Sequence, residues 1–311
     1  MQRLLSTALV LGLLIATAAA FAITEGLKLV QSPVTRTQVS KVVAPICGCE
    51  KQTATIKFWL RRRDTLTLDV LDAHRHEVKR LVDHVSAHRR WNTFHWDGRT
   101  NSGSVAQDGG YFVRVHLTHR TILLPNRIQV DTKAPRVTDA TANRLVFSPD
   151  GDGQSDSIKI RYRLSERAHA LLFVRGKQVV KTHFSRRKDS LTWYGRVHGV
   201  ALPPGTYRLR VGAVDVAGNV TGPAHGAPVV VHVRYIALAR HEVTGIKART
   251  RLGVGVDTDA AFYDWRLGTR TGSSSAKLLV VRAPAKPGRY RLVVTDRGHS
   301  DRATVIVEPR R

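Results

Sequence analysis

Three carboxylates lie close together in a glycine-rich turn of the chain. Asp150, Asp152 and Asp156 occupy positions 1, 3 and 7 of this turn, and the Gln154 carbonyl adds a further oxygen. Calcium takes about six to eight oxygen ligands, so such a turn supplies about half of a site. The pattern predicts a structural Ca²⁺ site. The alternative is a metal-free turn in which the Asp side chains accept hydrogen bonds from backbone N–H groups.

Two cysteines, Cys47 and Cys49, stand where a gap-free alignment of residues 43–60 on residues 147–164 places the carboxylate turn. In an oxidising compartment this pair predicts a disulfide, either within the chain or to another chain. The alternative is a soft-metal site completed by histidines. Four histidines follow in the sequence, namely His74, His76, His84 and His88.

The sequence lacks the motifs of common enzymes. It contains no Gly-x-Ser-x-Gly elbow, no His-Glu-x-x-His pair, no P-loop and no Gly-x-Gly-x-x-Gly turn. Cys47 could act as a nucleophile only beside a histidine and a carboxylate, and the neighbouring Cys49 favours oxidation instead. We therefore expect a protein that is not an enzyme.

The carboxylate turn opens one of three related β-modules. A Gly-x-Tyr element followed by alternating apolar residues occurs at 109–115, 205–211 and 288–294. Alternation with a period of two is typical of a strand with one buried face. A Trp-x-Gly element precedes it in the first two modules, and we expect its tryptophans to pack in the cores rather than to stack on carbohydrate. The expected core-motif residues are Trp96, Gly98, Tyr111, Trp193, Gly195, Tyr207 and Tyr290.

Short strands at turn-marked spacing, in modules of about 90–100 residues, predict an all-β chain of tandem immunoglobulin-like β-sandwiches. The expected modules are 43–133, 134–234 and 235–311, the third being a smaller, diverged sandwich without the carboxylate turn or Trp-x-Gly. Residues 24–42 read as a polar linker.

The order of these motifs resembles the FlgD/Vpr-type Ig-like domain of bacterial surface and secreted proteins over residues 43–234. Pro-Asp-Gly-Asp-Gly-x-x-Asp is followed by an alternating strand, Trp-Asp-Gly, a Gly-x-Tyr strand and Asp-x-Ala-Gly-Asn. The first module replaces the carboxylate turn with residues 46–50, and the second has Tyr194 where the pattern has Asp. Nothing matches the hook-assembly segment of the flagellar hook-capping protein, so the resemblance implies no flagellar role.

An apolar run of about 20 residues, from Leu4 to Ile23, follows Arg3 near the N-terminus. The run predicts export, with the chain after about Thr24 outside the cell membrane. Ala20-Phe21-Ala22 satisfies a cleavage site, but the run is longer than an ordinary signal peptide core, which favours an uncleaved anchor in residues 1–23.

The chain carries 50 Lys+Arg against 24 Asp+Glu, a formal net charge of +26, which attracts polyanions. The cations are spread over all modules, including the clusters 61–63 and 186–188, and no nucleic-acid-binding motif is present. We expect an envelope protein with a structural or adhesive role that binds an anionic cell-wall polymer or an envelope protein. A scaffold or binding subunit for a secreted enzyme or a glycan is the alternative, and nucleic-acid capture is the least favoured function.

Overall fold

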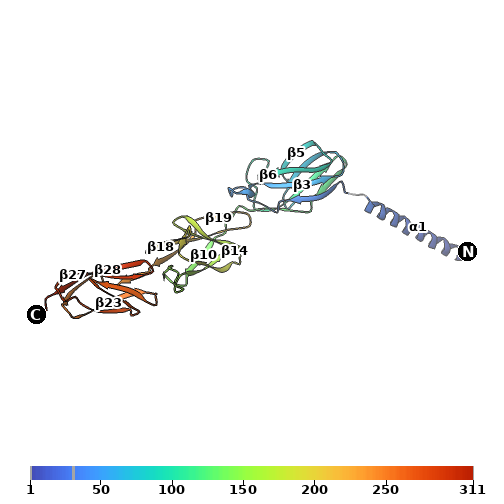
Figure 1. Ribbon diagram of the computed structural model, residues 1–311. Helices are drawn as coiled ribbons and strands as arrows, with labels where there is room; N and C mark the ends of the chain where they lie inside the picture. The colour runs from blue at the N-terminus through green and yellow to red at the C-terminus, as the bar shows by residue number, and fades with distance from the viewer. Residues whose placement is uncertain (1, 30–31, 311) are drawn as a thin grey trace. The chain divides into compact units, whose positions relative to one another are not determined.

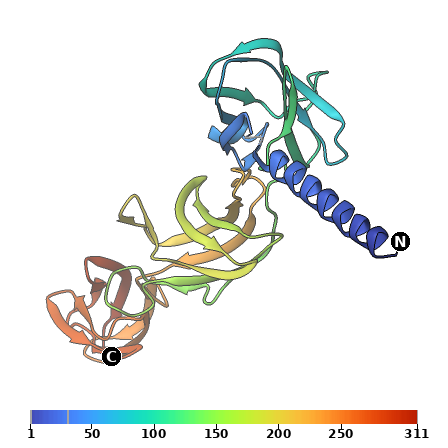
Figure 2. The same cartoon turned by 90° about the vertical axis from the view of Figure 1, so that its right-hand side faces the viewer.

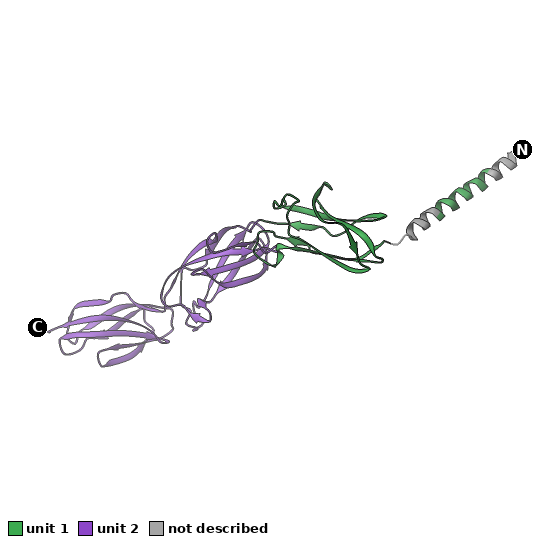
Figure 3. Ribbon diagram, turned by 90° about the horizontal axis from the view of Figure 1, so that it is seen from above, with its two compact units in different colours: residues 1–132 green, residues 133–311 purple. Residues whose placement is uncertain are grey.

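The computed structural model describes residues 2–29 and 32–310 of the 311-residue chain (Figure 1). It consists of one long helix, α1 (Gln2–Leu29), followed by β-structure. The chain divides into two compact units, residues 1–132 and residues 133–311 (Figure 3). Within the described residues, no helix is both long enough and apolar enough to cross a membrane. The predicted apolar run extends beyond the side chains described in α1, which are those of residues 9–22.

Module 1, residues 32–132, is a β-sandwich of two sheets (Figure 2). One sheet has the order β1 (Val34–Val39), β3 (Ala54–Leu60), β6 (Arg90–Trp96). The other has the order β2 (Val42–Val43), β9 (Ile128–Val130), β7 (Gly109–Leu117), β4 (Asp64–Leu71), β5 (Glu77–Ala87), with β8 (Arg120–Leu123) paired to β7. A 3₁₀ turn, η1 (Glu50–Gln52), lies between β2 and β3.

Module 2, residues 133–235, repeats this strand order. Its smaller sheet is β10 (Val137–Ala142), β12 (Ile158–Leu164), β15 (Lys188–Trp193). Its larger sheet is β11 (Val146–Phe147), β20 (Ala227–Val233), β18 (Gly205–Val214), β13 (Ala168–Val174), β14 (Lys177–Ser185), with β19 (Val220–Thr221) paired to β18. The short hairpin β16 (Arg196–Val197) and β17 (Val200–Ala201) stands apart from both sheets.

Module 3, residues 236–310, has the same two-sheet plan. The smaller sheet is β21 (Ile236–Leu238), β23 (Arg251–Thr258), β26 (Leu278–Arg282). The larger sheet is β22 (Glu242–Lys247), β28 (His299–Glu308), β27 (Gly288–Asp296), β24 (Tyr263–Leu267), β25 (Arg270–Ser274). The prediction of an all-β chain of tandem immunoglobulin-like β-sandwiches is confirmed.

Each module has its own hydrophobic core between its two sheets. The alternation that predicted the strands explains these cores. In β3, for example, Ile56, Phe58 and Leu60 point inward and are fully buried or nearly so, while the residues between them are partly exposed. This burial of alternate side chains, with an aliphatic face toward the opposite sheet, is the main force that stabilises each sandwich.

The N-terminal boundary of module 1 differs from the expected one. The segment 24–42 was expected to be a polar linker. Instead, α1 continues to Leu29, and Val34–Val39 form strand β1. Val34 is 7% exposed and pairs with Leu60, so β1 belongs to the sandwich. The sequence of β1 contains few apolar residues, because an edge strand needs few of them, and so it lacks the alternation that identifies a strand.

Candidate functional site

The predicted carboxylate turn lies between β11 and β12, and its Asp side chains have different roles. Asp156 caps the turn, because its two oxygens accept hydrogen bonds from Gly151 N at 2.6 Å and Gly153 N at 2.7 Å. Asp152 Oδ1 accepts one from Gln154 N at 2.6 Å. Asp156 therefore matches the metal-free alternative for its own position, and it does not join the other two carboxylates.

Asp150 and Asp152 instead meet a carboxylate from module 3. Oxygens of Asp150, Asp152 and Asp259 all lie within 4.8 Å of one another. Asp259 comes from the β23–β24 loop, about 100 residues further along the chain. A fourth carboxylate, Asp296 at the end of β27, is 7% exposed and close enough for the charges of Asp150 and Asp152 to act on it. We call these four residues the junction carboxylates.

Three oxygen atoms of the junction carboxylates are buried without a hydrogen bond in the part of the chain that the structure describes. They are both oxygens of Asp259 and Oδ2 of Asp296. Burial raises the pKa of Asp259 to about 6, with Asp152 and Asp150 adding to the rise, and burial followed by the same two charges raises the pKa of Asp296. Ser148 lowers the pKa of Asp259 but does not offset burial, and its hydroxyl donates to Asp150 Oδ2 at 3.2 Å.

Tyr235 connects modules 2 and 3 beside these carboxylates. It is 1% exposed within the core of module 2, and its hydroxyl donates to the Leu202 carbonyl at 2.5 Å. The ring of Tyr235 also stacks in parallel on the imidazole ring of His299 in module 3, with the two ring centroids 3.5 Å apart. Arg234, the preceding residue, forms an ion pair with Asp257 of β23. Both modules therefore belong to one compact unit.

Cys47 and Cys49 form a disulfide with each other, with Cα atoms 5.2 Å apart. The bridge closes the turn between β2 and η1. Cys49 N also donates to Cys47 Sγ at 3.2 Å. With both thiols bonded, the pair offers no thiolate for the soft-metal site that the sequence left open.

The predicted core-motif residues occupy equivalent places in the modules. Trp96 and Trp193 are buried, and each donates its indole N–H to a carbonyl three residues later, that of Arg99 at 2.8 Å or Arg196 at 3.1 Å. Each motif tyrosine donates its hydroxyl to the carbonyl four residues before it: Tyr111 to Gln107 at 2.8 Å, Tyr207 to Pro203 at 2.7 Å and Tyr290 to Lys286 at 2.8 Å. Their role is structural.

The two motif glycines lie against prolines. Gly98 has φ +71° and packs on Pro45, and Gly195 has φ +65° and packs on Pro149. A side chain at either position would overlap the proline ring, and the positive φ also favours glycine. The Trp-x-Gly element and the proline before the turn are thus two halves of one packing contact.

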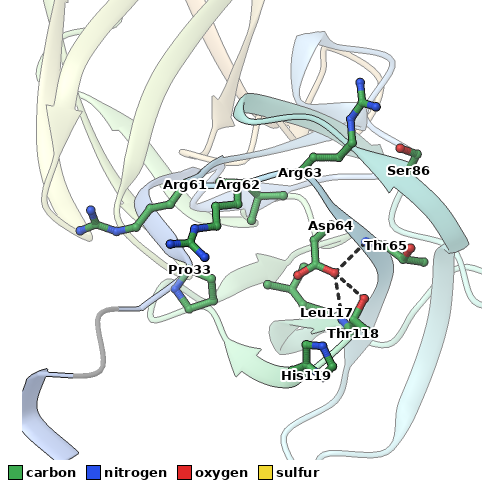
Figure 4. Close-up of a pocket in the computed structure, with 11 residues that line it drawn as sticks. Pro33, Arg61, Arg62, Arg63, Asp64, Thr65, Ser86, Leu117, Thr118 and His119 are labelled. Carbon is green, nitrogen blue, oxygen red and sulfur yellow. Dashed lines mark hydrogen bonds between the residues drawn. The ribbon is translucent and has the colours of Figure 1, made fainter. Parts of the chain in front are cut away.

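A basic hollow of about 870 Å³ lies at one end of module 1 (Figure 4). Arg61, Arg62 and Arg63 and His119 line it, and all four are exposed. Figure 4 shows Arg61 and Arg62 on the side of Pro33, while Arg63 points toward Ser86. The hollow can receive an anion, but its guanidinium groups do not converge on one point.

The acidic residue in this hollow is already engaged. Asp64 accepts hydrogen bonds from Thr65 N at 2.7 Å, Thr118 N at 3.1 Å and Thr118 Oγ1 at 2.5 Å. Burial raises the pKa of Asp64, but these hydrogen bonds and the charge of His119 outweigh burial and lower the pKa below its ordinary value. Asp64 therefore holds the turn between β7 and β8 through Thr118, and its hydrogen bonds go to Thr65 and Thr118 rather than to the arginines.

A row of cations lies on the outer face of the smaller sheet of module 2. Lys159, Arg161 and Arg163 alternate with the buried residues of β12 and are all exposed, and Lys188 of β15 pairs with Arg163. We call these four residues the basic row. Alternate residues of a strand are about 6.8 Å apart, so the positive charges repeat at that interval. Within β10, β12 and β15 the outward positions carry one carboxylate, Asp139, opposite Arg163.

The corresponding face of module 1 carries aromatic rings instead. Trp59 of β3 pairs with Trp91 of β6, with ring centroids 5.9 Å apart and planes at 88°. Trp91 is 39% exposed and Trp59 is partly exposed. Sequence reasoning missed this pair, although the alternation of β3 already places Trp59 on the face opposite Phe58 and Leu60.

Comparison with known proteins gives only distant similarities. No family model matches the chain, and no curated protein matches it. A structure of three immunoglobulin domains of titin is 13% identical, covers 90% of this chain and 100% of its own, and has a TM-score of 0.33. Trypsin-activated alpha-2-macroglobulin from Escherichia coli is 11% identical over 88% of this chain and 23% of its own, with a TM-score of 0.28.

A third structure is the Bacteroides ovatus SGBP-B of a mixed-linkage glucan utilization locus, in complex with a mixed-linkage heptasaccharide. It is 15% identical, covers 90% of this chain and 69% of its own, and has a TM-score of 0.22. Superpositions this loose say nothing about ligands. The immunoglobulin-like assignment stands on the strand order of the three modules, and no family hit supports the narrower FlgD/Vpr type.

Proposed function

We propose that this chain is an exported, non-enzymatic envelope protein whose immunoglobulin-like modules bind an anionic cell-wall polymer through their basic surfaces. The observation that carries the proposal is the basic row on module 2. Its four exposed side chains form no ion pair within residues 32–310, so their charge is available to a ligand.

The geometry of the row favours a polymer over a small anion. Three cations at about 6.8 Å intervals along one strand match a chain that carries a negative group on each repeat. The four side chains are all exposed on the outer face of a sheet, whereas sites for single small molecules are concave and enclose most of the ligand. Arginine, which supplies two of these cations, forms paired hydrogen bonds to phosphate and carboxylate groups.

The export half of the proposal rests on the sequence of the N-terminal segment and on the disulfide. A Cys47–Cys49 bridge is favoured in an oxidising compartment, as expected outside the cell membrane. The apolar run from Leu4 to Ile23 serves in this proposal as the signal anchor or signal peptide.

The test is binding of the full chain to a poly(glycerol phosphate) polymer at several salt concentrations. Arg161→Glu combined with Arg163→Glu should weaken binding and reduce the slope of log affinity against log salt by about 1 to 2. The control is Lys177→Glu combined with Lys181→Glu, which makes the same charge change at exposed positions of β14 in the larger sheet. Equal losses from both pairs would show that net charge, not the row, governs binding.

Competition separates this proposal from nucleic-acid capture, since both predict salt dependence. Counted in negative charges, less wall polymer should be needed to displace bound duplex DNA than DNA is needed to displace bound wall polymer. The reverse order would favour nucleic acid as the ligand.

A second candidate function, glycan binding, is favoured by the exposed Trp59–Trp91 pair. Exposed aromatic rings with nearby polar groups can stack on sugar rings, and Thr93 and His95 are exposed on the same strand as Trp91. Retention on neutral glucan that is lost in Trp91→Ala and kept in Arg161→Glu/Arg163→Glu would support this function. No retention of the wild-type chain would exclude neutral glucan as its ligand.

A further inference from the structure

The junction carboxylates bring four negative groups together in a chain that is otherwise basic. The sequence offers 50 Lys+Arg for 24 Asp+Glu, yet no ion pair in residues 32–310 involves Asp150, Asp152, Asp259 or Asp296. Arg297 and His299 lower the pKa of Asp296 in part, but neither is bonded to it. A cluster of this kind needs a positive partner.

The oxygens that lack a partner are buried, which distinguishes this cluster from an exposed acidic patch. Asp296 is 7% exposed with Oδ2 unbonded, and both oxygens of Asp259 are buried and unbonded, among the described residues. Burying an ionised carboxylate without a hydrogen bond or counter-ion is costly, so native proteins pair such groups or place them on a metal.

We propose that Asp150 and Asp152 of module 2 and Asp259 of module 3 bind one Ca²⁺ ion, and that this ion fixes the joint between the two modules. The three side chains are close enough to share one ion, with oxygens within 4.8 Å of one another. Asp296 is the fourth carboxylate, near enough for the charges of Asp150 and Asp152 to raise its pKa.

The donor set selects the ion. It consists of oxygens, which suit hard cations, and His299 is stacked on Tyr235 rather than turned toward a metal. A cavity of about 110 Å³ beside Asp259, lined also by Ser148 and Tyr235, has room for water ligands. Three carboxylates from two loops suit the flexible coordination of Ca²⁺ with about six to eight oxygens better than the strict octahedron of Mg²⁺.

The expected effect on the joint follows from where the ligands lie. Without a cation, the carboxylates of module 2 repel those of module 3 and oppose the contacts made by Tyr235 and Arg234. With the ion bound, the same carboxylates hold the modules together. Calcium therefore acts on the joint, whereas the metal site expected from the sequence lies wholly within module 2 and includes Asp156, which the structure uses as a cap.

The first test is a titration of the full chain with CaCl₂ alone, in which calorimetry measures the affinity and the number of ions bound. Wild type should bind one ion at the junction, and Asp259→Asn should weaken binding at least tenfold. The control is Glu242→Gln, which makes the same charge change at an exposed position of β22 in module 3, outside the cluster. It should bind as wild type does. No binding by wild type at millimolar calcium, or equal binding by Asp259→Asn, would overturn the proposal.

Thermal unfolding distinguishes a metal ligand from a structural side chain. In chelator, Asp259→Asn should unfold at the same temperature as wild type or higher, because it removes an uncompensated buried charge. In calcium it should unfold at a lower temperature than wild type. A lower temperature in both conditions would mean that Asp259 merely supports the loop.

The joint itself is tested with spin labels on His183→Cys in module 2 and Arg289→Cys in module 3, both exposed positions. The native cysteines are bonded to each other and do not take the label. Calcium should narrow the distribution of distances between the labels in the wild-type background and in Glu242→Gln, and leave it unchanged in Asp259→Asn. A distribution that calcium does not alter in any background would refute the role at the joint.

Discussion

Replacement of Gly195 by alanine tests the packing contact that recurs between the Trp-x-Gly element and the proline of the preceding turn. A methyl group at Gly195 would lie 2.6 Å from Pro149 Cγ, 2.7 Å from Pro149 Cβ and 2.8 Å from Phe147 Cε2. Phe147 is 1% exposed, so it cannot move toward solvent without opening the core. The substitution also places a side chain at φ +65°.

These two effects give the expected magnitude. A left-handed backbone costs about 1–2 kcal/mol for a residue with a side chain, and overpacking a filled core costs about 1–3 kcal/mol. Gly195→Ala should therefore destabilise module 2 by about 2–5 kcal/mol. Gly199→Ala is the matched control, because Gly199 has φ +81° and open space around it, so it should cost about 1–2 kcal/mol.

Urea unfolding followed by tryptophan fluorescence measures the difference, since Trp193 lies two residues before Gly195. With a slope of about 2 kcal/mol per molar urea, the midpoint of Gly195→Ala should fall about 0.5–1.5 M below that of Gly199→Ala. Equal midpoints for the two variants would refute the steric part of the reasoning.

Four other predictions concern the disulfide, the joint and pH. Replacing Cys47 and Cys49 together by serine should lower the stability of module 1 by about 1–2 kcal/mol in the same urea assay, because a bridge across so few residues restrains little of the unfolded chain. Tyr235→Ala should cost about 3–5 kcal/mol and split the calorimetric unfolding of residues 133–311 into two transitions, because it removes a buried ring shared by both modules. In chelator, residues 133–311 should become more stable as pH falls from 7 to 4, because a pKa of about 6 for Asp259 against 3.8 when unfolded means that the folded state binds more protons. Module 1 should lose the contribution of Asp64 as pH falls below 3.8, because the pKa of this group is lowered in the folded state, and urea midpoints measured against pH check both trends.

The sequence predicted the architecture because the signal for a sandwich is local. Alternation in β3 and β12 identifies buried faces, and the Gly-x-Tyr element marks the same strand in all three modules. Even module 3, which lacks Trp-x-Gly, folds with the strand order of the other two. Edge strands such as β1 were missed because pairing on one side needs little apolar surface.

The junction carboxylates could be predicted from the sequence only in part, for a physical reason. Asp150, Asp152 and Asp156 have equivalent side chains, and spacing alone does not tell which of them turns back to cap backbone N–H groups. Asp259 lies in a loop whose sequence carries no metal motif, and it reaches the cluster because modules 2 and 3 pack together. A contact between modules has no signature in the local sequence. The outward direction of Trp59, in contrast, follows from strand alternation.

In every module the first strand of the larger sheet runs parallel to the last. β2 pairs with β9, β11 with β20, and β22 with β28. A pull on the two ends of a module therefore slides these strands along each other and loads their hydrogen bonds in shear, all at once, rather than opening them one at a time. The pairing extends over two residues in modules 1 and 2, and over four from Glu242 to Lys247 in module 3. Under tension, module 3 is the module expected to hold longest, and the other two are the ones expected to lengthen first.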